Sequence, residues 1–281
     1  EWDSFENANA RMADLEHPEN NRILSKHVSQ ALDGPKSFPN NNMIVVGAPG
    51  TGKSLFVIAP NILKCISSYL FMDPKGELVE KYGNYMRKNG YQIRVLNLKN
   101  MEQSDRYNPF VYIRSEDDIP RLIMNIFKSV EPPDAQKGDP FWDDGCALYL
   151  QSLFYFVWGL SVKDKKLLFY EAHLNWESVY ETKTLNQVTR LTQLESSKIK
   201  SDSDDDDDST QLSLLMDQLE KMHPDHPAVR DYKKLKEGAP ETVASILLIL
   251  NGKFKFFYSS SIQRIFEADD MNLWELGTGW H

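Results

Sequence analysis

Residues 43–54 of this chain read Met43-Ile-Val-Val-Gly47-Ala48-Pro49-Gly50-Thr51-Gly52-Lys53-Ser54. From Gly47 onward the stretch fits G-x-x-x-x-G-K-[ST], the pattern of a phosphate-binding loop, and it stands after a short apolar run and before a predicted helix. Its glycines permit backbone angles and close approaches that a Cβ atom would block, so successive N–H groups can turn toward a phosphate. The sequence therefore predicts an anion site at this loop.

Charge and helix direction favour the same ligand. Lys53 adds a point charge, and the helix predicted to begin near Gly52 directs its free N–H groups and positive dipole end at the loop. Ser54 is expected to hold Mg²⁺ through its hydroxyl. The sequence thus predicts ATP and Mg²⁺ as cofactors, bound by Gly47, Ala48, Pro49, Gly50, Thr51, Gly52, Lys53 and Ser54.

The order of apolar runs around this loop is typical of a doubly wound α/β sheet. Predicted strands at Met43–Val46, Tyr69–Met72 and Ile93–Leu98 alternate with helices, and Pro60 is expected to kink or end the first helix. Right-handed crossovers would place the loop and Asp73 together at the carboxyl ends of the strands. Two interpretations of Asp73 stay open: the acidic residue of a magnesium strand, or a shaper of the tight turn with Pro74 and Gly76.

From Pro120 the pattern changes to helices. Phe141–Leu160 is predicted to be a core helix rather than a nucleic-acid stacking platform, because its aromatic residues wrap more than one face. Other helices are expected at Arg121–Val130, Thr184–Leu194, Leu212–Met222, Ala228–Lys236 and Thr242–Phe257.

The composition of the chain limits the classes of function that it can have. The chain has 281 residues, 41% of them hydrophobic, and a net charge of −9, which argues against a chain-wide nucleic-acid footprint. Six aspartates between Asp202 and Asp208 account for much of this net charge, which would be −9 + 6 = −3 without them. Two cysteines give no disulfide framework or metal spacing, and the most apolar stretch, Ala147–Leu160, is too short to cross a bilayer.

Two polar segments in the helical block have competing interpretations. The acidic run fails the calcium-loop pattern, which leaves a solvated loop or an acidic docking site. His223-Pro-Asp-His226-Pro is interpreted as a turn in which Asp225 or a neighbour caps the next helix, because its prolines prevent the helical spacing of zinc motifs. No catalytic residue is identified.

Further motifs of this sequence resemble those of a known family. They are Ala59-Pro-Asn61, Asp73-Pro-Lys-Gly-Glu77, Tyr107-Asn-Pro-Phe110, Phe141-Trp142, His223-Pro-Asp-His226 and Asp269-Asp-Met271. Together with the loop, they resemble the coupling ATPases of type IV secretion and conjugation, the TraG-type family. By this resemblance Asp73 and Glu77 match the family's second acidic block and join the expected cofactor-binding residues.

The resemblance implies a membrane-anchored motor that uses ATP to deliver relaxase-bound single-stranded DNA, or protein substrates, to a secretion channel. The implied fold is α/β, a RecA-like P-loop NTPase sheet, here incomplete, with an inserted all-α domain. The expected domains are an amino-terminal arm (1–40), the first part of the nucleotide domain (41–130), the all-α substrate-recognition domain (131–265) and a return segment (266–281). Expected partners are the relaxase or relaxosome accessory proteins, DNA and the channel.

Two departures from the family shape the expectation for this chain. The family's membrane helices and its later strand ending in adjacent Asp and Glu are not found in the sequence. The hypothesis is therefore a soluble fragment, acting at the cytoplasmic face of the bacterial membrane, that hydrolyses ATP poorly while its parent is an ATPase. The parent would be a homo-hexamer and the fragment a monomer.

Two alternatives remain. In one, the chain is a non-catalytic recognition module whose helical block binds relaxosome proteins. In the other it is a small-molecule P-loop kinase. That option ranks last because only Arg87, Arg94 and Arg106 follow the loop before Phe110, at scattered positions.

Overall fold

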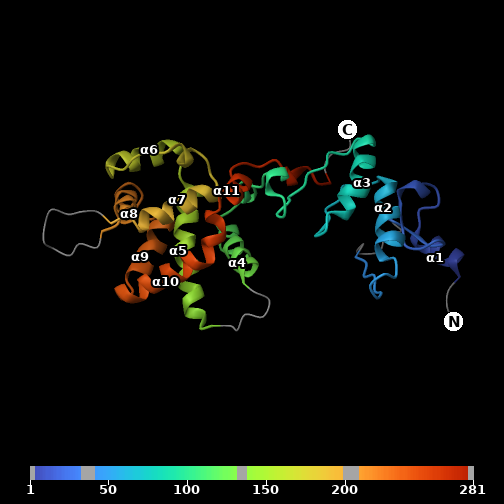
Figure 1. Ribbon diagram of the computed structural model, residues 1–281, viewed down its shortest axis with the longest axis horizontal. Coiled ribbons are helices and arrows are strands. Elements are labelled where there is room, and N and C mark those ends of the chain that lie inside the picture. The colour runs from blue at the N-terminus through green and yellow to red at the C-terminus, as the bar shows by residue number, and fades with distance from the viewer. Residues whose placement is uncertain (1–3, 33–41, 132–137, 199–208, 278–281) are drawn as a thin grey trace. The chain divides into compact units, whose positions relative to one another are not determined.

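The computed structural model describes residues 4–32, 42–131, 138–198 and 209–277. It divides into two compact units (Figure 1), which are treated separately below. The loop unit contains Glu1–Arg94 and Asn272–His281, and the helical unit contains Val95–Met271.

The loop unit begins with a short helix and a small hairpin. Helix α1 (Phe5–Met12) is followed by a 3₁₀ turn, η1 (Pro18–Asn20), and strands β1 (Asn21–Ile23) and β2 (Ser29–Ala31), which pair antiparallel. The side chain of Asn61 accepts from Ile23 N at 2.8 Å and donates to Ile23 O at 2.8 Å. This amide satisfies both backbone groups of Ile23 and ties the hairpin to the helix that follows the phosphate loop.

That helix runs past Pro60 instead of ending there. A π-helical turn, η2 (Ser54–Ile58), leads into α2 (Ala59–Lys64), with Ala59 N donating to Ser54 O. Pro60, in the first turn of α2, has no N–H group to donate. The π-helical turn η2 does not require that N–H group, so the helix continues to Lys64. The expectation that the helix ends at Pro60 is therefore wrong, and the alternative expectation of a kink there stays a prediction. After a connecting segment, α3 (Glu77–Lys88) completes the helices of the loop unit, and a 3₁₀ turn, η7 (Leu273–Glu275), lies in its carboxyl-terminal part.

None of the three expected parallel strands, at 43–46, 69–72 and 93–98, is a strand in the structure. Within the described residues, the one sheet is the hairpin β1–β2. Ile44 and Val46 are each 90% exposed and Met72 is 89% exposed. An extended stretch becomes a strand only when a neighbour takes up its backbone groups. The RecA-like sheet therefore stays a prediction.

The described residues of the helical unit are mainly helical. Its α-helices are α4 (Asp118–Val130), α5 (Pro140–Gly159), α6 (Val162–Glu171), α7 (Leu185–Glu195), α8 (Gln211–Met222), α9 (Pro227–Lys236), α10 (Pro240–Phe254) and α11 (Ser260–Phe266). Its 3₁₀ turns are η3 (Met101–Gln103), η4 (Pro109–Tyr112), η5 (Ser178–Glu181) and η6 (Lys255–Tyr258). The six helices expected after Pro120 are present with shifts of at most three residues at either end, whereas α6 and α11 were not expected.

Local chemistry explains most of these helix starts. The side chains of Asp139, Ser161, Thr184 and Thr210 accept hydrogen bonds from backbone N–H groups of the first turns of α5, α6, α7 and α8. Proline stands in the first turn of α5, α9 and α10, where its missing donor costs nothing. His226, in the segment interpreted as a turn, caps α9 by accepting from Ala228 N at 3.2 Å.

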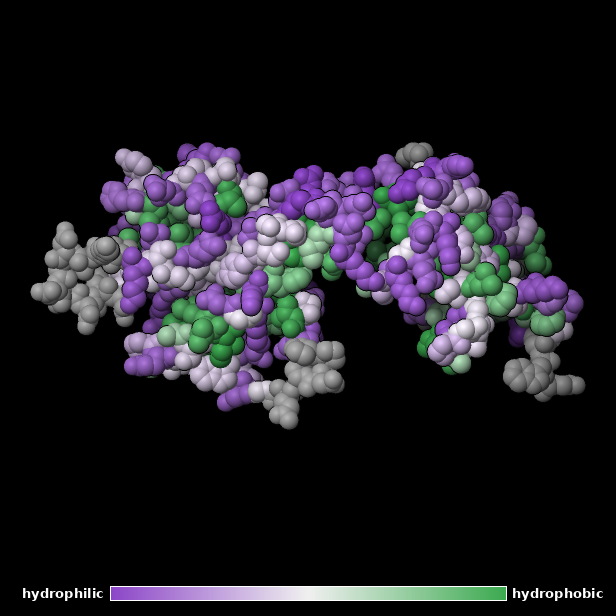
Figure 2. All heavy atoms as spheres, viewed as in Figure 1, coloured by the Kyte–Doolittle hydropathy of each residue, from purple (hydrophilic) through white to green (hydrophobic). Residues whose placement is uncertain are grey.

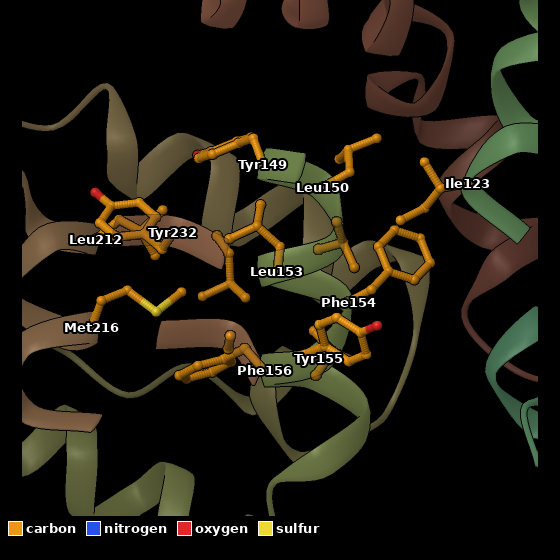
Figure 3. Close-up of a cluster of buried hydrophobic side chains, with 14 of the residues drawn as sticks. Ile123, Tyr149, Leu150, Leu153, Phe154, Tyr155, Phe156, Leu212, Met216 and Tyr232 are labelled. Atoms are coloured by element: carbon orange, nitrogen blue, oxygen red, sulfur yellow. The ribbon is translucent and has the colours of Figure 1, made fainter. Parts of the chain in front are cut away.

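Helix α5 lies at the centre of the helical unit. It packs against α4, α7, α9 and α10, and Phe154 and Phe156 are completely buried. Figure 3 shows its side chains pointing to opposite sides, toward Ile123 of α4 and toward Met216 of α8. This confirms that the aromatic helix is a core helix. In the described chain no single helix meets the length and apolarity needed to span a membrane, and only α5 with α6, bent by 117°, meets them as a pair.

A buried lysine donates a hydrogen bond to the last turn of α5. Lys165 of α6 is 0% exposed, and its Nζ donates to Val157 O and to the side-chain oxygen of Gln187, both at 3.0 Å. Its burial, with a smaller effect of Lys183, lowers the pKa of Lys165 to about 7. The lysine satisfies a carbonyl at the end of α5 that has no partner within the helix. The charged run around Lys165 gave no apolar pattern, which is why α6 was missed.

Hydrogen bonds and an ion pair join the first and last segments of the helical unit. Arg106 Nε and Nη2 donate to the carboxylate of Asp270 at 2.7 and 2.9 Å, and Asp270 N donates to Arg106 O at 2.9 Å. Beside this pair, Asp269 accepts from Asn108 N at 3.0 Å and from the Tyr112 hydroxyl at 2.6 Å. We call this group the Arg106–Asp270 clasp. It joins segments about 160 residues apart, so the chain enters and leaves the unit at one place.

We expect Lys165→Met to change how stability depends on pH. The unfolded chain, whose lysine pKa is about 10.4, binds more protons than the folded one between that value and the folded pKa of about 7. The free energy of unfolding of the wild type should therefore rise with pH across this window. Between pH 6 and pH 9, the free energy of unfolding of the wild type should rise by about 2 kcal/mol more than that of Lys165→Met. Urea unfolding at each pH measures the difference. Lys166→Met, at an exposed neighbour, is the control, and parallel profiles for wild type and Lys165→Met would contradict the assignment.

The clasp predicts that Asp270→Asn destabilises the helical unit by about 1 kcal/mol, a modest value because both partners keep about a third of their side chains exposed. Glu267→Gln is the matched control, since Glu267 makes only a 3.4 Å contact with Arg106. Urea unfolding of the two variants at low and at high salt gives the measurement. Equal effects of the two substitutions would argue against a clasp.

Candidate functional site

The phosphate-loop segment forms a tight turn held by its own side chains. Thr51 donates to Ala48 O through its backbone N at 3.3 Å and through Oγ1 at 2.8 Å. Gly50 and Gly52 have φ angles of +81° and +83°. Side chains with a Cβ atom rarely adopt this conformation, so the loop requires glycine at both places.

Close packing explains the other glycine position. A Cβ atom on Gly47 would lie 2.6 Å from Thr51 Oγ1, and one on Gly52 would lie 2.5 Å from the ring of Phe56. The loop therefore curls more tightly than a chain with side chains at these positions could. A cradle of this kind suits a phosphate group bound by backbone N–H groups.

Lys53 lies over the same turn. Its Nζ donates to Gly47 O at 2.6 Å and to Ala48 O at 2.9 Å, which leaves one of its three donors. Ser54 is exposed at the start of η2, and in the described part of the chain its hydroxyl has no hydrogen-bond partner. The ammonium group, the hydroxyl and the start of the helix thus gather at one loop, a donor set that fits a magnesium-bound triphosphate.

Asp73 and Glu77 belong to a separate turn. Asp73 Oδ2 accepts from Leu78 N at 2.8 Å and from Val79 N at 3.3 Å, so this carboxylate caps α3. Glu77 is exposed and pairs with Lys75 at 4.0 Å and Lys81 at 3.7 Å. The structure gives Asp73 the turn-shaping role, and a role for either residue at a nucleotide stays a prediction. Across the described residues, no hydrogen bond or ion pair joins them to the loop Gly47–Ser54.

The sequence did not predict that two of the other quoted motifs contact each other. Tyr107-Asn108-Pro-Phe110 and Asp269-Asp-Met271 were noted separately, and the structure brings them together in the Arg106–Asp270 clasp. No local signal could have paired them, because the contacts cross about 160 residues. The acidic run 202–208 lies outside the described residues. Within the described ranges, no group of three or more His, Cys, Asp or Glu is arranged to hold a metal ion.

These observations first define a class: a chain with a loop of nucleotide-binding pattern in one compact unit and a second unit built of helices. A family model described as type IV secretory system conjugative DNA transfer matches residues 9–279. The chain therefore belongs to this family of type IV secretion proteins for conjugative DNA transfer, which confirms the resemblance to conjugative coupling proteins. A search of curated proteins found no match.

The capping role of Asp73 can be separated from a role of its charge. Asp73→Ala should lower the free energy of unfolding by about 1 kcal/mol, because two N–H groups of α3 lose their acceptor. Asp73→Asn keeps an oxygen acceptor and should recover most of the loss. Glu77→Gln, at an exposed pair, should change little. Thermal or urea unfolding tests this, and equal losses for the alanine and asparagine variants would show that charge, not the hydrogen bonds, is needed.

Proposed function

We propose that the chain is part of a coupling ATPase of a conjugative type IV secretion system. In this proposal it binds ATP with Mg²⁺ at Gly47–Ser54 and recruits relaxase-bound DNA or protein substrates to the translocation channel. The observation that carries it is the tight glycine loop with Lys53 over it, in a chain whose family transfers DNA by conjugation.

The loop residues have distinct roles in the proposal. The N–H groups at the turn and at the start of η2 would bind the phosphates, with Gly47 and Gly52 keeping the space that the phosphates need. Lys53 would use its third donor, and then the two that now bind Gly47 O and Ala48 O, to neutralise phosphate charge. Ser54 would hold the magnesium through its hydroxyl. Bound ATP–Mg²⁺ would supply the phosphoryl group whose transfer drives transport.

The helical unit would supply substrate recognition. It has one continuous hydrophobic core around α5, and the Arg106–Asp270 clasp holds its two chain ends together. These features support a unit that can present a partner-binding surface while the nucleotide site lies in another unit. The expected partners are relaxase or relaxosome accessory proteins, single-stranded DNA and the secretion channel, with the parent a homo-hexamer at the cytoplasmic face of the membrane.

A non-catalytic recognition module is the second candidate. The observation that favours it is the exposure of Ile44, Val46 and Met72, which a complete nucleotide domain would bury in its sheet. In this case the helical unit would bind relaxosome proteins without any contribution from the loop.

Calorimetry with ATP and Mg²⁺ separates the two candidates. The coupling-ATPase proposal expects the wild-type chain to bind, and Lys53→Ala to bind at least about tenfold more weakly, because a hydrogen bond to a charged group is lost. Lys75→Ala, at an exposed lysine outside the loop, is the matched control and should bind like the wild type. Absence of binding by the wild-type chain would leave only the recognition module. Equal binding by the Lys53 variant would place the nucleotide elsewhere.

A further inference from the structure

The helix that follows the phosphate loop is buried in one part only. Ala59 and Ile62 of α2 are buried, whereas no residue of the π-helical turn η2 is buried. Leu55 and Phe56 of this turn are 61% and 66% exposed, and Figure 2 shows hydrophobic atoms at the surface in the region where Figure 1 draws α2. Burial therefore fixes α2, while the turn that begins with Ser54 depends on its hydrogen bonds.

Pro60 explains the width of this turn. In a regular α-helix its ring would clash with the carbonyl group of Phe56, four residues earlier. The hydrogen bond from Ala59 N to Ser54 O spans one residue more than an α-helical bond, and the wider turn makes room for the ring. A return to α-helical spacing would rotate the preceding chain by about 100° around the helix axis. The width of the turn therefore decides how Lys53 and Ser54 are presented relative to α2.

The side chain of Asn61 connects this turn to the amino-terminal hairpin. Its Nδ2 donates to Val57 O, a carbonyl group of η2, at 2.7 Å. The same Nδ2 donates to Ile23 O in β1 at 2.8 Å, and Oδ1 accepts from Ile23 N at 2.8 Å. The two N–H donors of the amide are thus divided between the turn and the hairpin. The bonds to Ile23 therefore hold the amide in the orientation that reaches the turn.

We propose that Asn61 is a positioning residue for the nucleotide site, through which the hairpin β1–β2 and ATP binding stabilise each other. The inference rests on the proposed binding of ATP with Mg²⁺ at Gly47–Ser54. With Ile23 in place, Asn61 holds the π-helical turn, and the turn holds Lys53 and Ser54 relative to α2. When the hairpin opens, the amide loses two of the three hydrogen bonds that orient it. A nucleotide bound by Lys53 and Ser54 opposes that opening.

Hydrogen exchange of the Ile23 amide tests this coupling in the full wild-type chain. The Ile23 N–H group bonds directly to Asn61 Oδ1, so its exchange rate reports the opening of this contact. Saturating ATP with Mg²⁺ should slow the exchange by at least about fivefold, the lower end of the usual coupling between two sites. An Asn61 that only attached the hairpin to α2 would give no such response. The amide of Asp270, bonded to Arg106 O in the helical unit, is the internal control and should not respond.

Two variants test the coupling from the side of the nucleotide. Asn61→Ala should bind ATP with Mg²⁺ at least about fivefold more weakly than the wild type in calorimetry, because coupling between two sites is reciprocal. Lys64→Met is the matched control. Lys64 Nζ donates to Pro18 O at 3.2 Å and so also joins α2 to the amino-terminal residues, but from the end of α2 away from the turn. Lys64→Met should therefore keep the wild-type affinity, and urea unfolding checks that both variants are folded.

Three results would overturn the coupling while leaving the nucleotide site in place. They are ATP binding that leaves the exchange of the Ile23 amide unchanged, a folded Asn61→Ala that binds ATP like the wild type, and equal weakening of ATP binding by Lys64→Met. If Asn61→Ala does not fold, the exchange of Ile23 in the wild type decides. Absence of ATP binding by the wild-type chain would instead refute the nucleotide site, and the coupling with it, so the two failures are distinguished.

Discussion

Burial of residues 152–157 of α5 on all sides is the constraint on which the helical unit depends. A helix whose aromatic and aliphatic residues wrap more than one face cannot lie on a surface, so neighbouring helices must cover it. Covering it also buries Val157 in its last turn, where the last carbonyl groups have no partner within the helix. Lys165 and Lys183 donate to Val157 O and Trp158 O there. The burial of a lysine in this core is thus a consequence of burying the helix end.

The same core makes the two functional proposals separable. Because α5 organises one continuous core and the Arg106–Asp270 clasp joins the ends of the unit, the helical unit needs no residue of the phosphate loop to hold its core together. The loop in turn is held by contacts among Gly47, Ala48, Thr51 and Lys53. The proposed nucleotide binding and the proposed partner binding would therefore depend on different residues.

Polar groups that lack partners mark the places where function can be sought. The Ser54 hydroxyl, exposed at the start of a helix, suits a metal ion already bound to phosphate. The Tyr149 hydroxyl also makes no hydrogen bond within the described structure, but it is buried from solvent in the helical unit. Of these two hydroxyl groups, only that of Ser54 is therefore accessible to a ligand.

The sequence by itself determined what rests on neighbours within a few residues. The turn Gly47–Ser54 is made by its own glycines, and the starts of α5, α7 and α9 follow from prolines and capping side chains next to them. The motifs around the loop also identified the family correctly. The tertiary structure alone decided the burial of Lys165, the meeting of Arg106 with Asp270, and the isolation of the Tyr149 hydroxyl. Each depends on atoms far apart in the chain, and no local pattern of charge or hydropathy encodes which distant residues will meet.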